Sequence, residues 1–425
     1  MSEEFFKDDM KIDNVSVSDI ALTYGTPCFL YSEETIIKNF NAISNSFCSE
    51  KRHLYYAVKA NSNLSILNCL NNLGAGFDIV SLGELHRVAK INSNTNKIVY
   101  SGVGKTRDEI IESLNLNIRC INVESIEELF RIERISNELG VRAPIAIRIN
   151  PNIDTDTHSY VATGHEDSKF GISREDMNDV FSYAIESNNL NLIGIHYHIG
   201  SQILSVEPFI LAIEFIANVY NEVTSMGANI ELINMGGGLG INYTNENPPE
   251  LDFFGKSIVA AIEKNKMQNL DFILELGRSI VGNAGYLLTQ VEYVKKTKTK
   301  NFVVVNAGMD NLIRPALYQS IHEISNIKSG NTGEKILCDI VGPVCECSDF
   351  FLKDIEINVE QGDILVIKSC GAYASSMSSN YNSRRRAAEV LIRKGKHIKI
   401  RDRDSLEDLY DKEILIWEKQ GEKGK

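Results

Sequence analysis

Apolar residues recur in short runs along the first two thirds of this chain, separated by stretches of mixed polarity. The runs are rich in β-branched and aromatic residues, as buried strands are. Eight strands are predicted, at Leu54–Val58, Phe77–Val80, Lys97–Ser101, Arg119–Val123, Pro144–Ile149, Leu192–His198, Ile230–Met235 and Phe272–Glu275. Helical spacing predicts helices between most of them, including Leu64–Leu73, Leu82–Ile91, Arg107–Leu114, Ser125–Leu139 and Pro208–Met226. Strands that alternate with helices form a parallel sheet, and eight in succession predict a (β/α)8 barrel.

The pattern changes after Gly285, where strands follow one another without long helices between them. The predicted strands are Tyr286–Val294, Asn301–Asn306, Lys335–Val341, Asp363–Lys368, Ala387–Ile392 and His397–Arg401, the last two forming a hairpin around Lys394-Gly395. We therefore expect a C-terminal β-sandwich or barrel-like domain. The polar tail from Ser405 is expected to form a helix with a frayed end.

One strand is predicted before the barrel, at Cys28–Tyr31, followed by a helix capped by Ser32. A leading strand has no place inside a closed barrel, so we expect it to join the β domain. The predicted division is an N-terminal segment of the β domain at 1–40, a barrel at 41–285 and a C-terminal β domain at 286–425. The predicted fold class is α/β, with a (β/α)8 barrel and a β domain that the N-terminal strand joins.

The composition of the 425-residue chain is that of an ordinary globular protein, with 43% hydrophobic and 24% charged residues. A net charge of −13 argues against nucleic acid and anionic membrane surfaces as partners. The acidic start lacks the apolar core of a signal peptide, and no window approaches the ~18 consecutive apolar residues of a membrane span. Eight scattered cysteines without a C-x-x-C pair indicate thiols in a reducing compartment. These features predict a cytoplasmic protein.

Lys59 stands where the first predicted barrel strand ends. Partial desolvation at the rim of an apolar strand favours the neutral amine, which is a nucleophile toward aldehydes. An isolated lysine in such a place more often extends its amine into solvent. The ends of the other strands decide between these interpretations, because functional side chains of a barrel gather at the C-terminal ends of its strands.

The seventh strand runs directly into Gly236-Gly237-Gly238-Leu239-Gly240, and the eighth into Glu275-Leu276-Gly277-Arg278. Consecutive glycines let backbone N–H groups approach an anion closely. Phosphate is often bound after strands 7 and 8 of such barrels. Ile241 occupies the third glycine position of G-x-G-x-x-G, so a dinucleotide-binding motif is excluded.

The sixth strand ends at His196 and His198, which point to one face because they are two residues apart. Two histidines permit a metal site, but no third and fourth ligand matches them. An imidazole near a lysine is instead suited to stacking on an aromatic cofactor, and Ser201 is suited to donating to a phosphate. Asp78, at the end of the second strand, is a further carboxylate near this rim, where helix capping is its simplest role.

A nucleophilic lysine, a glycine-rich phosphate site, a stacking histidine and a carboxylate together describe a site for pyridoxal 5′-phosphate. Lys59 would bond to the aldehyde of this cofactor. Glu275 would keep the pyridine nitrogen protonated, because a close negative charge favours the charged form of the ring. A protonated ring is an electron sink for a carbanion at the Cα of an amino-acid substrate.

Longer motifs carry a resemblance over roughly residues 15 to 415. They are YYAVKAN, GFDIVSLGEL, SKFGI, HYHIGSQI, NMGGGLGINY, LELGRSIVGNAG, MDNLIRPALY, GPVCECSDF and GAYASSMSSNYNSR. The chain resembles the diaminopimelate decarboxylases, within the alanine-racemase-like, fold-type III pyridoxal-phosphate enzymes. The resemblance implies decarboxylation of meso-2,6-diaminopimelate to L-lysine and CO2, the last step of lysine biosynthesis, by a homodimer.

The resemblance also implies roles for particular residues. Lys59 would hold the cofactor covalently, and His198 would stack on its ring. Further cofactor contacts would come from Asp78, Ser201, Gly236, Gly237, Gly238, Glu275, Gly277, Arg278 and Tyr373. The substrate would be bound by Arg278, Arg314, Tyr318, Glu346 and Tyr373, with no metal in the site. Cys345 and Glu346 would come from the partner chain, with Cys345 as proton donor.

The charges agree with this substrate. Diaminopimelate keeps one carboxylate after the other leaves, and that group needs a bidentate cationic clamp, which Arg supplies better than Lys. Glu346 is then available for the distal ammonium. Taken alone, Arg314 would be a surface residue at a helix start, and Cys345 a small buried thiol.

One stretch departs from the family, at Ser383-Arg384-Arg385-Arg386, where a proline is common. It lies beside Tyr373 and Tyr381 in the predicted site, so we expect it to alter loop stiffness or substrate access.

Other functions remain open at this point. A relative could decarboxylate ornithine, arginine or carboxynorspermidine, although such enzymes typically have aspartate where this chain has Glu346. A racemase fits less well, because the Cys345 segment suits reprotonation after loss of CO2. A metal-dependent barrel hydrolase would use His196 and His198, and a non-catalytic regulatory homologue would not need the reactive residues that are present.

Overall fold

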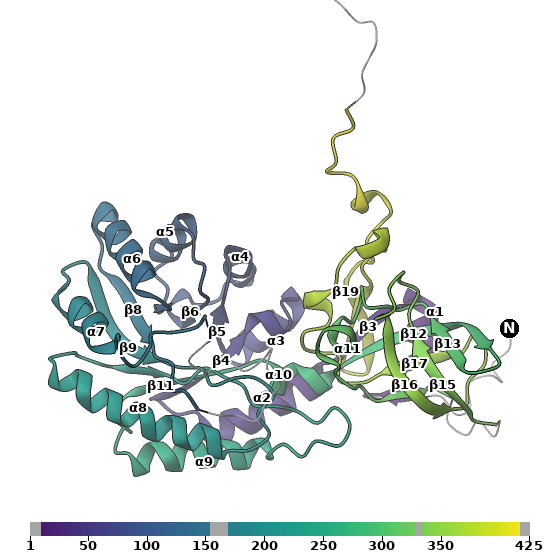
Figure 1. Ribbon diagram of the computed structural model, residues 1–425, viewed down its shortest axis with the longest axis horizontal. Helices are drawn as coiled ribbons and strands as arrows, with labels where there is room; N and C mark the ends of the chain where they lie inside the picture. The colour runs from purple at the N-terminus through teal and green to yellow at the C-terminus, as the bar shows by residue number, and fades with distance from the viewer. Residues whose placement is uncertain (1–9, 154–168, 329–333, 417–425) are drawn as a thin grey trace, which may run out of the picture.

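The computed structural model describes residues 10–153, 169–328 and 334–416. Two domains lie side by side along the long axis of the molecule (Figure 1). One is a closed barrel wrapped by helices, and the other consists mostly of strands. Both parts of the predicted fold class are confirmed.

Eight parallel strands close the barrel, in the spatial order β10-β11-β4-β5-β6-β7-β8-β9. The strands are β4 (Arg52–Ala57), β5 (Gly76–Ile79), β6 (Ile98–Tyr100), β7 (Cys120–Val123), β8 (Ala143–Arg148), β9 (Leu190–His196), β10 (Leu232–Asn234) and β11 (Asp271–Leu276). The last strand returns to pair with the first, which closes the sheet. All eight predicted strands are present, although the first ends at Ala57 and the sixth at His196, earlier than expected.

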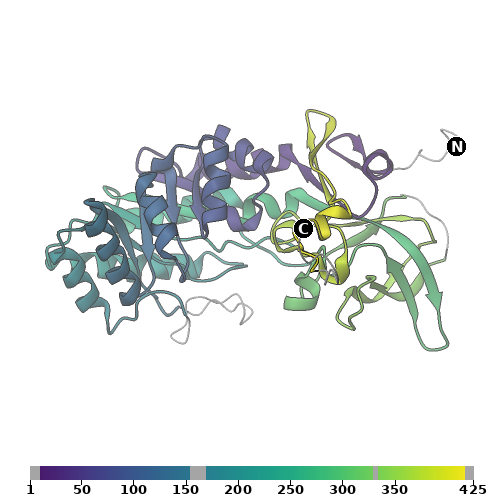
Figure 2. The same cartoon turned by 90° about the horizontal axis from the view of Figure 1, so that it is seen from above.

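Helices cover the outside of the barrel (Figure 2). They are α2 (Glu33–Phe47), α3 (Leu64–Asn72), α4 (Leu82–Lys90), α5 (Arg107–Asn115), α6 (Ile126–Leu139), α7 (Met177–Glu186), α8 (Glu207–Ser225), α9 (Leu251–Lys264) and α10 (Arg278–Val281). The five predicted helices agree with α3 to α6 and α8 to within one residue at each end. Side-chain caps fix where α3 to α6 begin, through Asn63, Ser81, Thr106 and Ser125.

The β domain is built on a sheet in the order β16-β15-β13-β12-β3-β18-β19, with β17 beside β12 and β14 beside β17. Its strands are β3 (Cys28–Ser32), β12 (Gly285–Lys296), β13 (Asn301–Val305), β14 (Ile324–Asn326), β15 (Ile336–Val341), β16 (Phe350–Ile357), β17 (Ile364–Ile367), β18 (Ala388–Arg393) and β19 (Lys396–Arg401). The predicted N-terminal strand, β3, lies between β12 and β18, so it joins this domain.

Two strands of the β domain were not predicted, β14 and β16. The apolar pattern of β16 is interrupted by Lys353-Asp354, where Asp354 has a φ of +53° and the pairing with β15 shifts register. A bulge of this kind breaks the alternation on which strand prediction depends. Three small elements were also missed: β1 (Lys11–Ile12), β2 (Val15–Ser16) and α1 (Val17–Tyr24). The helix start expected at Arg314 is present as α11 (Arg314–Tyr318).

The helix predicted from Ser405 is wrong within the described residues. Only a 3-10 turn forms there, at Glu407–Leu409, and the chain then runs away from both domains (Figure 1). Leu406, Tyr410 and Ile414 are all exposed. A short segment that buries no apolar face gains too little to form a stable helix. The remainder of this prediction, from residue 417, lies outside the described residues.

The predicted boundary at residue 40 falls inside α2, which packs against α9 and β4 of the barrel. The boundary at 285 coincides with the start of β12. The division into domains at these residues stays a prediction.

The inside of the barrel has an apolar layer beneath a polar one. The apolar layer consists of Tyr55, Val99, Cys120, Ala146, Ile193, Leu232 and Ile273. Side chains two residues apart on a strand point the same way. Two residues further along five of these strands are buried polar side chains: Ser101, Asn122, Arg148, Asn234 and Glu275. This polar layer lies at the C-terminal ends of the strands, where barrel enzymes carry their chemistry.

Candidate active site

A cavity of about 370 Å³ opens above the polar layer. Its lining includes Lys59, His198, Ser201, Gly237, Gly238, Glu275, Gly277 and Arg278 from the barrel, and Arg314, Tyr318 and Tyr373 from the β domain. The cavity therefore lies between the two domains, and it brings together most of the predicted site residues. Asp78 and Gly236 lie directly behind this lining: Asp78 contacts Lys59, and a Cβ on Gly236 would meet His198.

A larger cavity, of about 560 Å³, lies at the opposite end of the barrel. Two of the cations that line it, Lys51 and Arg119, pair with Asp271 at 3.1 and 3.0 Å. None of the predicted site residues lines it, and the N-terminal face of such barrels generally serves stability.

Lys59 lies in a 3-10 turn, Val58–Ala60, immediately after β4. Its Nζ donates to Asp78 Oδ2 at 3.1 Å. Burial lowers the pKa of Lys59, but the negative charge of Asp78 and its hydrogen bond to the amine oppose burial, and the pKa lies above the ordinary value. The prediction of a neutral amine is therefore wrong for the chain without cofactor. Desolvation was the only effect visible at the strand end, whereas the deciding carboxylate comes from the neighbouring strand.

Asp78 is fully buried and is held by a hydrogen-bonded row across the polar layer. Its Oδ1 accepts from Ser101 Oγ at 2.7 Å, and Ser101 Oγ accepts from Asn122 Nδ2 at 2.9 Å. The simple role of helix capping is thus wrong, because Ser81 caps the following helix. The row holds the carboxylate of Asp78 toward Lys59.

Glu275 lies on β11 and is also buried. Asn234 Nδ2 donates to its Oε1 at 2.6 Å. Burial and the charge of Asp78 raise the pKa of Glu275 to about 8. This carboxyl at the floor of the cavity therefore holds its proton at neutral pH in the chain without cofactor.

Burial and the charge of Arg148 lower the pKa of both His196 and His198 well below the ordinary value, so both rings are neutral. His198 Nδ1 accepts from the backbone N–H of Gly237 at 3.1 Å, which places the ring proton on Nε2. Among the described residues, neither nitrogen of His196 has a hydrogen-bond partner, and no three His, Cys, Asp or Glu side chains form a metal site. The hydrolase hypothesis lacks its ligand set there.

The backbone of the glycine run after β10 lies in close contact with the backbone of neighbouring segments. A Cβ on Gly237 would lie 1.8 Å from the carbonyl oxygen of Glu275, and one on Gly238 would lie 2.2 Å from that of Gly200. Gly238 also has a φ of +116°, a backbone conformation that favours glycine. Both glycines line the cavity, so they offer it backbone without side chains.

Two arginines occupy the side of the cavity nearest the β domain. Arg278 Nη2 donates to Ser201 Oγ at 2.9 Å, and Arg278 packs over the ring of Tyr373 at 4.8 Å. Arg314 begins α11 as predicted, but it is buried rather than at the surface. Among the described residues, no carboxylate forms an ion pair with Arg278 or Arg314. Within the part of the chain that the structure describes, this end of the cavity is therefore cationic and unpaired.

The comparisons with known proteins agree with this geometry. Residues 33–282 match the family model "Pyridoxal-dependent decarboxylase, pyridoxal binding domain". The diaminopimelate decarboxylase of Pseudomonas aeruginosa is 43% identical over 95% of this chain and 96% of that protein. The chain belongs to the diaminopimelate decarboxylase family. The solved enzyme from M. jannaschii with L-lysine superimposes with a TM-score of 0.91, at 38% identity over 97% of each chain. The Helicobacter pylori enzyme with L-lysine gives 0.88, at 42% identity over 93% of this chain and 98% of that one.

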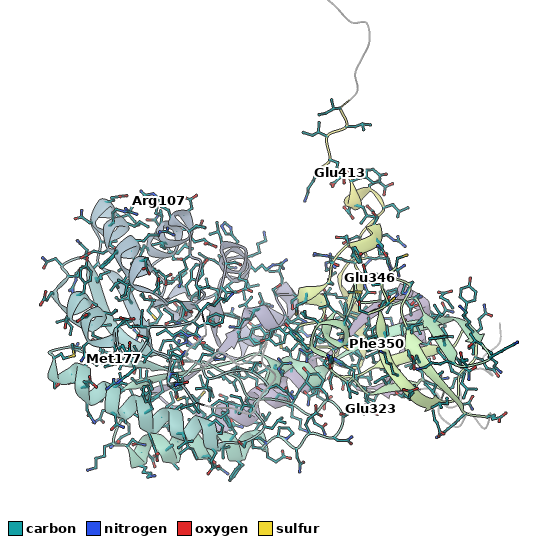
Figure 3. The ribbon with its side chains drawn as sticks, viewed as in Figure 1. Arg107, Met177, Glu323, Glu346, Phe350 and Glu413 are labelled. Carbon is teal, nitrogen blue, oxygen red and sulfur yellow. The ribbon has the colours of Figure 1, made fainter. Side chains whose placement is uncertain are left out.

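Two predicted residues of this decarboxylase family site stand apart from the cavity. Cys345 and Glu346 are exposed, on the connection between β15 and β16 in the β domain. Glu346 is labelled in Figure 3. The backbone N–H of Cys345 donates to Asn382 Oδ1 at 2.9 Å, and Tyr381 OH donates to Glu346 Oε1 at 2.5 Å. Neither residue lines the cavity of its own chain. Their predicted roles remain proposals.

Contacts of Arg384 and Arg386 anchor residues 383–386, the stretch that departs from the family pattern. Arg384 Nε pairs with Asp310 Oδ2 at 3.2 Å, and its Nη2 donates to the carbonyl of Asn306 at 2.6 Å. The backbone of Arg386 donates to Asp404 Oδ2. Side-chain contacts thus anchor this stretch, while the expected effects on loop stiffness and substrate access stay predictions.

Sequence reasoning missed the polar side chains that support the site. Ser101, Asn122 and Asn234 hold Asp78 and Glu275, and Arg148 pairs with the buried Glu124 at 2.6 Å. Their signal was available in the two-residue periodicity of the strands, since each polar residue continues an inward-facing apolar position.

Proposed function

We propose that this chain is a diaminopimelate decarboxylase, which removes CO2 from meso-2,6-diaminopimelate and releases L-lysine with the help of pyridoxal 5′-phosphate. The observation that carries the proposal is that two buried guanidinium groups share a cavity with Lys59. A substrate with amino-acid groups at both ends places one end at Lys59 and offers its second carboxylate to Arg278 and Arg314. The expected role of this reaction is the biosynthesis of lysine.

The residues of the cavity fit the cofactor. Lys59 provides a primary amine for the aldehyde, and the bare backbone of Gly237 and Gly238 suits a phosphate. Glu275 is a buried carboxyl available to the ring nitrogen, and the uncharged ring of His198 suits stacking. When bound, pyridoxal 5′-phosphate supplies an electron sink for the pair of electrons that CO2 leaves behind at Cα.

Side chains of this protein accept or hold protons at defined atoms of the site. The amine of Lys59 must lose a proton before it reacts, and Asp78 Oδ2 is an acceptor 3.1 Å away. Glu275 is protonated when alone, and a positive charge beside it favours its carboxylate form. Asn234 orients that carboxyl throughout, because its amide donates to Oε1 in either state.

We infer that a homodimer completes the site by adding an acid that protonates Cα after CO2 leaves. We propose that Cys345 of the partner subunit provides this proton and that Glu346 of the partner subunit binds the distal ammonium. The support is that both side chains are exposed on each chain and absent from the lining of its own cavity. The eight free thiols also support a cytoplasmic location.

The substrate is tested by incubating purified holoenzyme with meso-diaminopimelate, ornithine and arginine and by measuring CO2 and amines. Lysine should form from diaminopimelate, and the two analogues should react on the order of 10⁴-fold more slowly because they lack the carboxylate that the arginines bind. Comparable decarboxylation of ornithine would overturn the assignment.

The shared site is tested with mixed dimers of Lys59→Ala and Cys345→Ala. Each variant alone should be nearly inactive. If the residues come from opposite chains, a mixed dimer has one site with both lesions and one intact site. Random reassortment makes about half of the dimers mixed, so roughly a quarter of wild-type activity should return. No recovery, with mixed dimers verified by mass, would place both residues in the same chain's site.

A further inference from the structure

Tyr243 lies behind the cationic end of the cavity, seven residues after the glycine run begins. It is 5% exposed, and it belongs to neither a helix nor a strand. Glu246 Oε2 fixes this turn, accepting from the backbone N–H groups of Tyr243 at 3.0 Å, Thr244 at 2.8 Å and Asn245 at 3.1 Å. The backbone that carries the Tyr243 ring is therefore held in one place.

Both arginines of the cavity contact Tyr243. Arg278 Nη1 donates to its hydroxyl at 2.5 Å. The guanidinium carbon of Arg314 lies 4.9 Å from the centre of its ring, and that of Arg278 lies 5.9 Å from it. A tyrosine ring attracts cations over its face, and its hydroxyl oxygen accepts a hydrogen bond. One side chain thus contacts both charges in two different ways.

Two positive charges held so close repel one another, and a carboxylate would ordinarily separate them. Among the described residues none does so, and Nε of both arginines is buried without a hydrogen-bond partner. Tyr318 adds a second ring near Arg314, with its centre 5.6 Å from the guanidinium carbon. Within the described residues, aromatic rings and hydroxyl groups rather than carboxylates therefore hold the pair, which leaves the charge for a ligand.

His322 supports Tyr243 from behind. The two rings meet edge to face, with centres 5.0 Å apart at 72°. His322 Nδ1 lies 2.9 Å from the carbonyl oxygen of Lys368, so it carries the proton and donates. Burial lowers the pKa of His322 to about 4, so the ring is neutral and adds no third positive charge.

We propose that Tyr243 is a positioning residue that holds Arg278 and Arg314 as a two-guanidinium clamp for the distal carboxylate of the substrate. This inference rests on the proposed function. Tyr243 does not line the cavity, so it acts through the arginines and not on the ligand. Its hydroxyl orients the guanidinium group of Arg278 through a hydrogen bond, and its ring face holds the guanidinium group of Arg314 in position.

The test is Tyr243→Phe, which removes the hydrogen bond to Arg278 and keeps the ring for Arg314 and His322. The KM for diaminopimelate should rise about tenfold or more, because a hydrogen bond to a charged group is lost. The kcat should change little, since the clamp binds ground state and transition state alike. Tyr55→Phe is the matched control, because Tyr55 is 4% exposed but lies at the opposite end of the barrel.

A binding measurement separates positioning from general damage. L-lysine carries a carboxylate, whereas cadaverine is the same chain without one. Calorimetry on the holoenzyme should show about tenfold weaker binding of lysine to Tyr243→Phe and unchanged binding of cadaverine. Equal losses for both ligands, or no loss for lysine, would overturn the proposal. A wild-type enzyme that binds lysine but does not decarboxylate diaminopimelate would instead refute the proposed function and leave the clamp standing.

Discussion

Replacing Gly237 by alanine should disable the site while leaving the barrel folded. The new Cβ would lie 1.8 Å from the carbonyl oxygen of Glu275, where ordinary contacts begin at 3.4 Å. The glycine run and the end of β11 must therefore separate by about 1.6 Å. That movement breaks the hydrogen bonds from Gly237 N to His198 Nδ1 and from Glu275 N to the carbonyl of Gly236.

A misplacement of about 1 Å costs on the order of 100-fold in catalysis, so kcat/KM of Gly237→Ala should fall at least that far. Cofactor affinity should fall with it, because this backbone faces the expected phosphate. Overpacking costs about 1–3 kcal/mol of stability, which a chain with this much buried core tolerates. Absorbance titration with pyridoxal 5′-phosphate, steady-state kinetics and thermal unfolding measure the three effects.

Gly104→Ala is the control, because a Cβ there has no atom within 4 Å and Gly104 does not have a positive φ. It should match the wild type in all three measurements. If Gly237→Ala bound the cofactor and turned over as the wild type does, the close approach of the glycine run would have no bearing on function.

Two further substitutions test the protons of the site. Asp78→Asn removes a negative charge that raises the pKa of Lys59. The pH at which cofactor binding to Lys59 is half-maximal should therefore fall by about one to three units, and an unchanged pH profile would contradict this. Glu275→Gln should lower kcat by about 10- to 150-fold, the worth of a hydrogen bond to a charged group, and a variant within twofold of the wild type would argue against a role at the ring nitrogen. Burial raises the pKa of Glu275 to about 8, so this carboxyl holds its proton more tightly in the folded state than in the unfolded state. Its contribution to stability is therefore present at low pH and is lost as pH rises toward 8. The melting temperature of the cofactor-free wild type should therefore fall between pH 5 and 8 relative to that of Glu275→Gln, whereas the exposed Glu127→Gln should follow the wild type.

The barrel was predictable because its strands are buried on both faces and therefore appear as continuous apolar runs. Lys59, Glu275 and the glycine run were found because they stand at strand ends, where a barrel concentrates its chemistry. The protonation of Lys59 was not predictable from local sequence, because Asp78 reaches it from another strand. Tyr243 was missed for the same reason, since only the fold brings it to Arg278 and Arg314. The bulge at Asp354 and the unpacked tail also depend on tertiary contacts that a single segment does not encode.

The central claim is that Lys59 holds the cofactor at the mouth of the barrel. Borohydride reduction of the holoenzyme, followed by peptide mapping, tests it directly. The added mass should appear on the peptide that contains Lys59 and should be absent from Lys59→Ala. Lys105 is an internal control, because its amine is buried and paired with Glu128 at 2.8 Å. A label on Lys105, or on any lysine other than Lys59, would contradict the account.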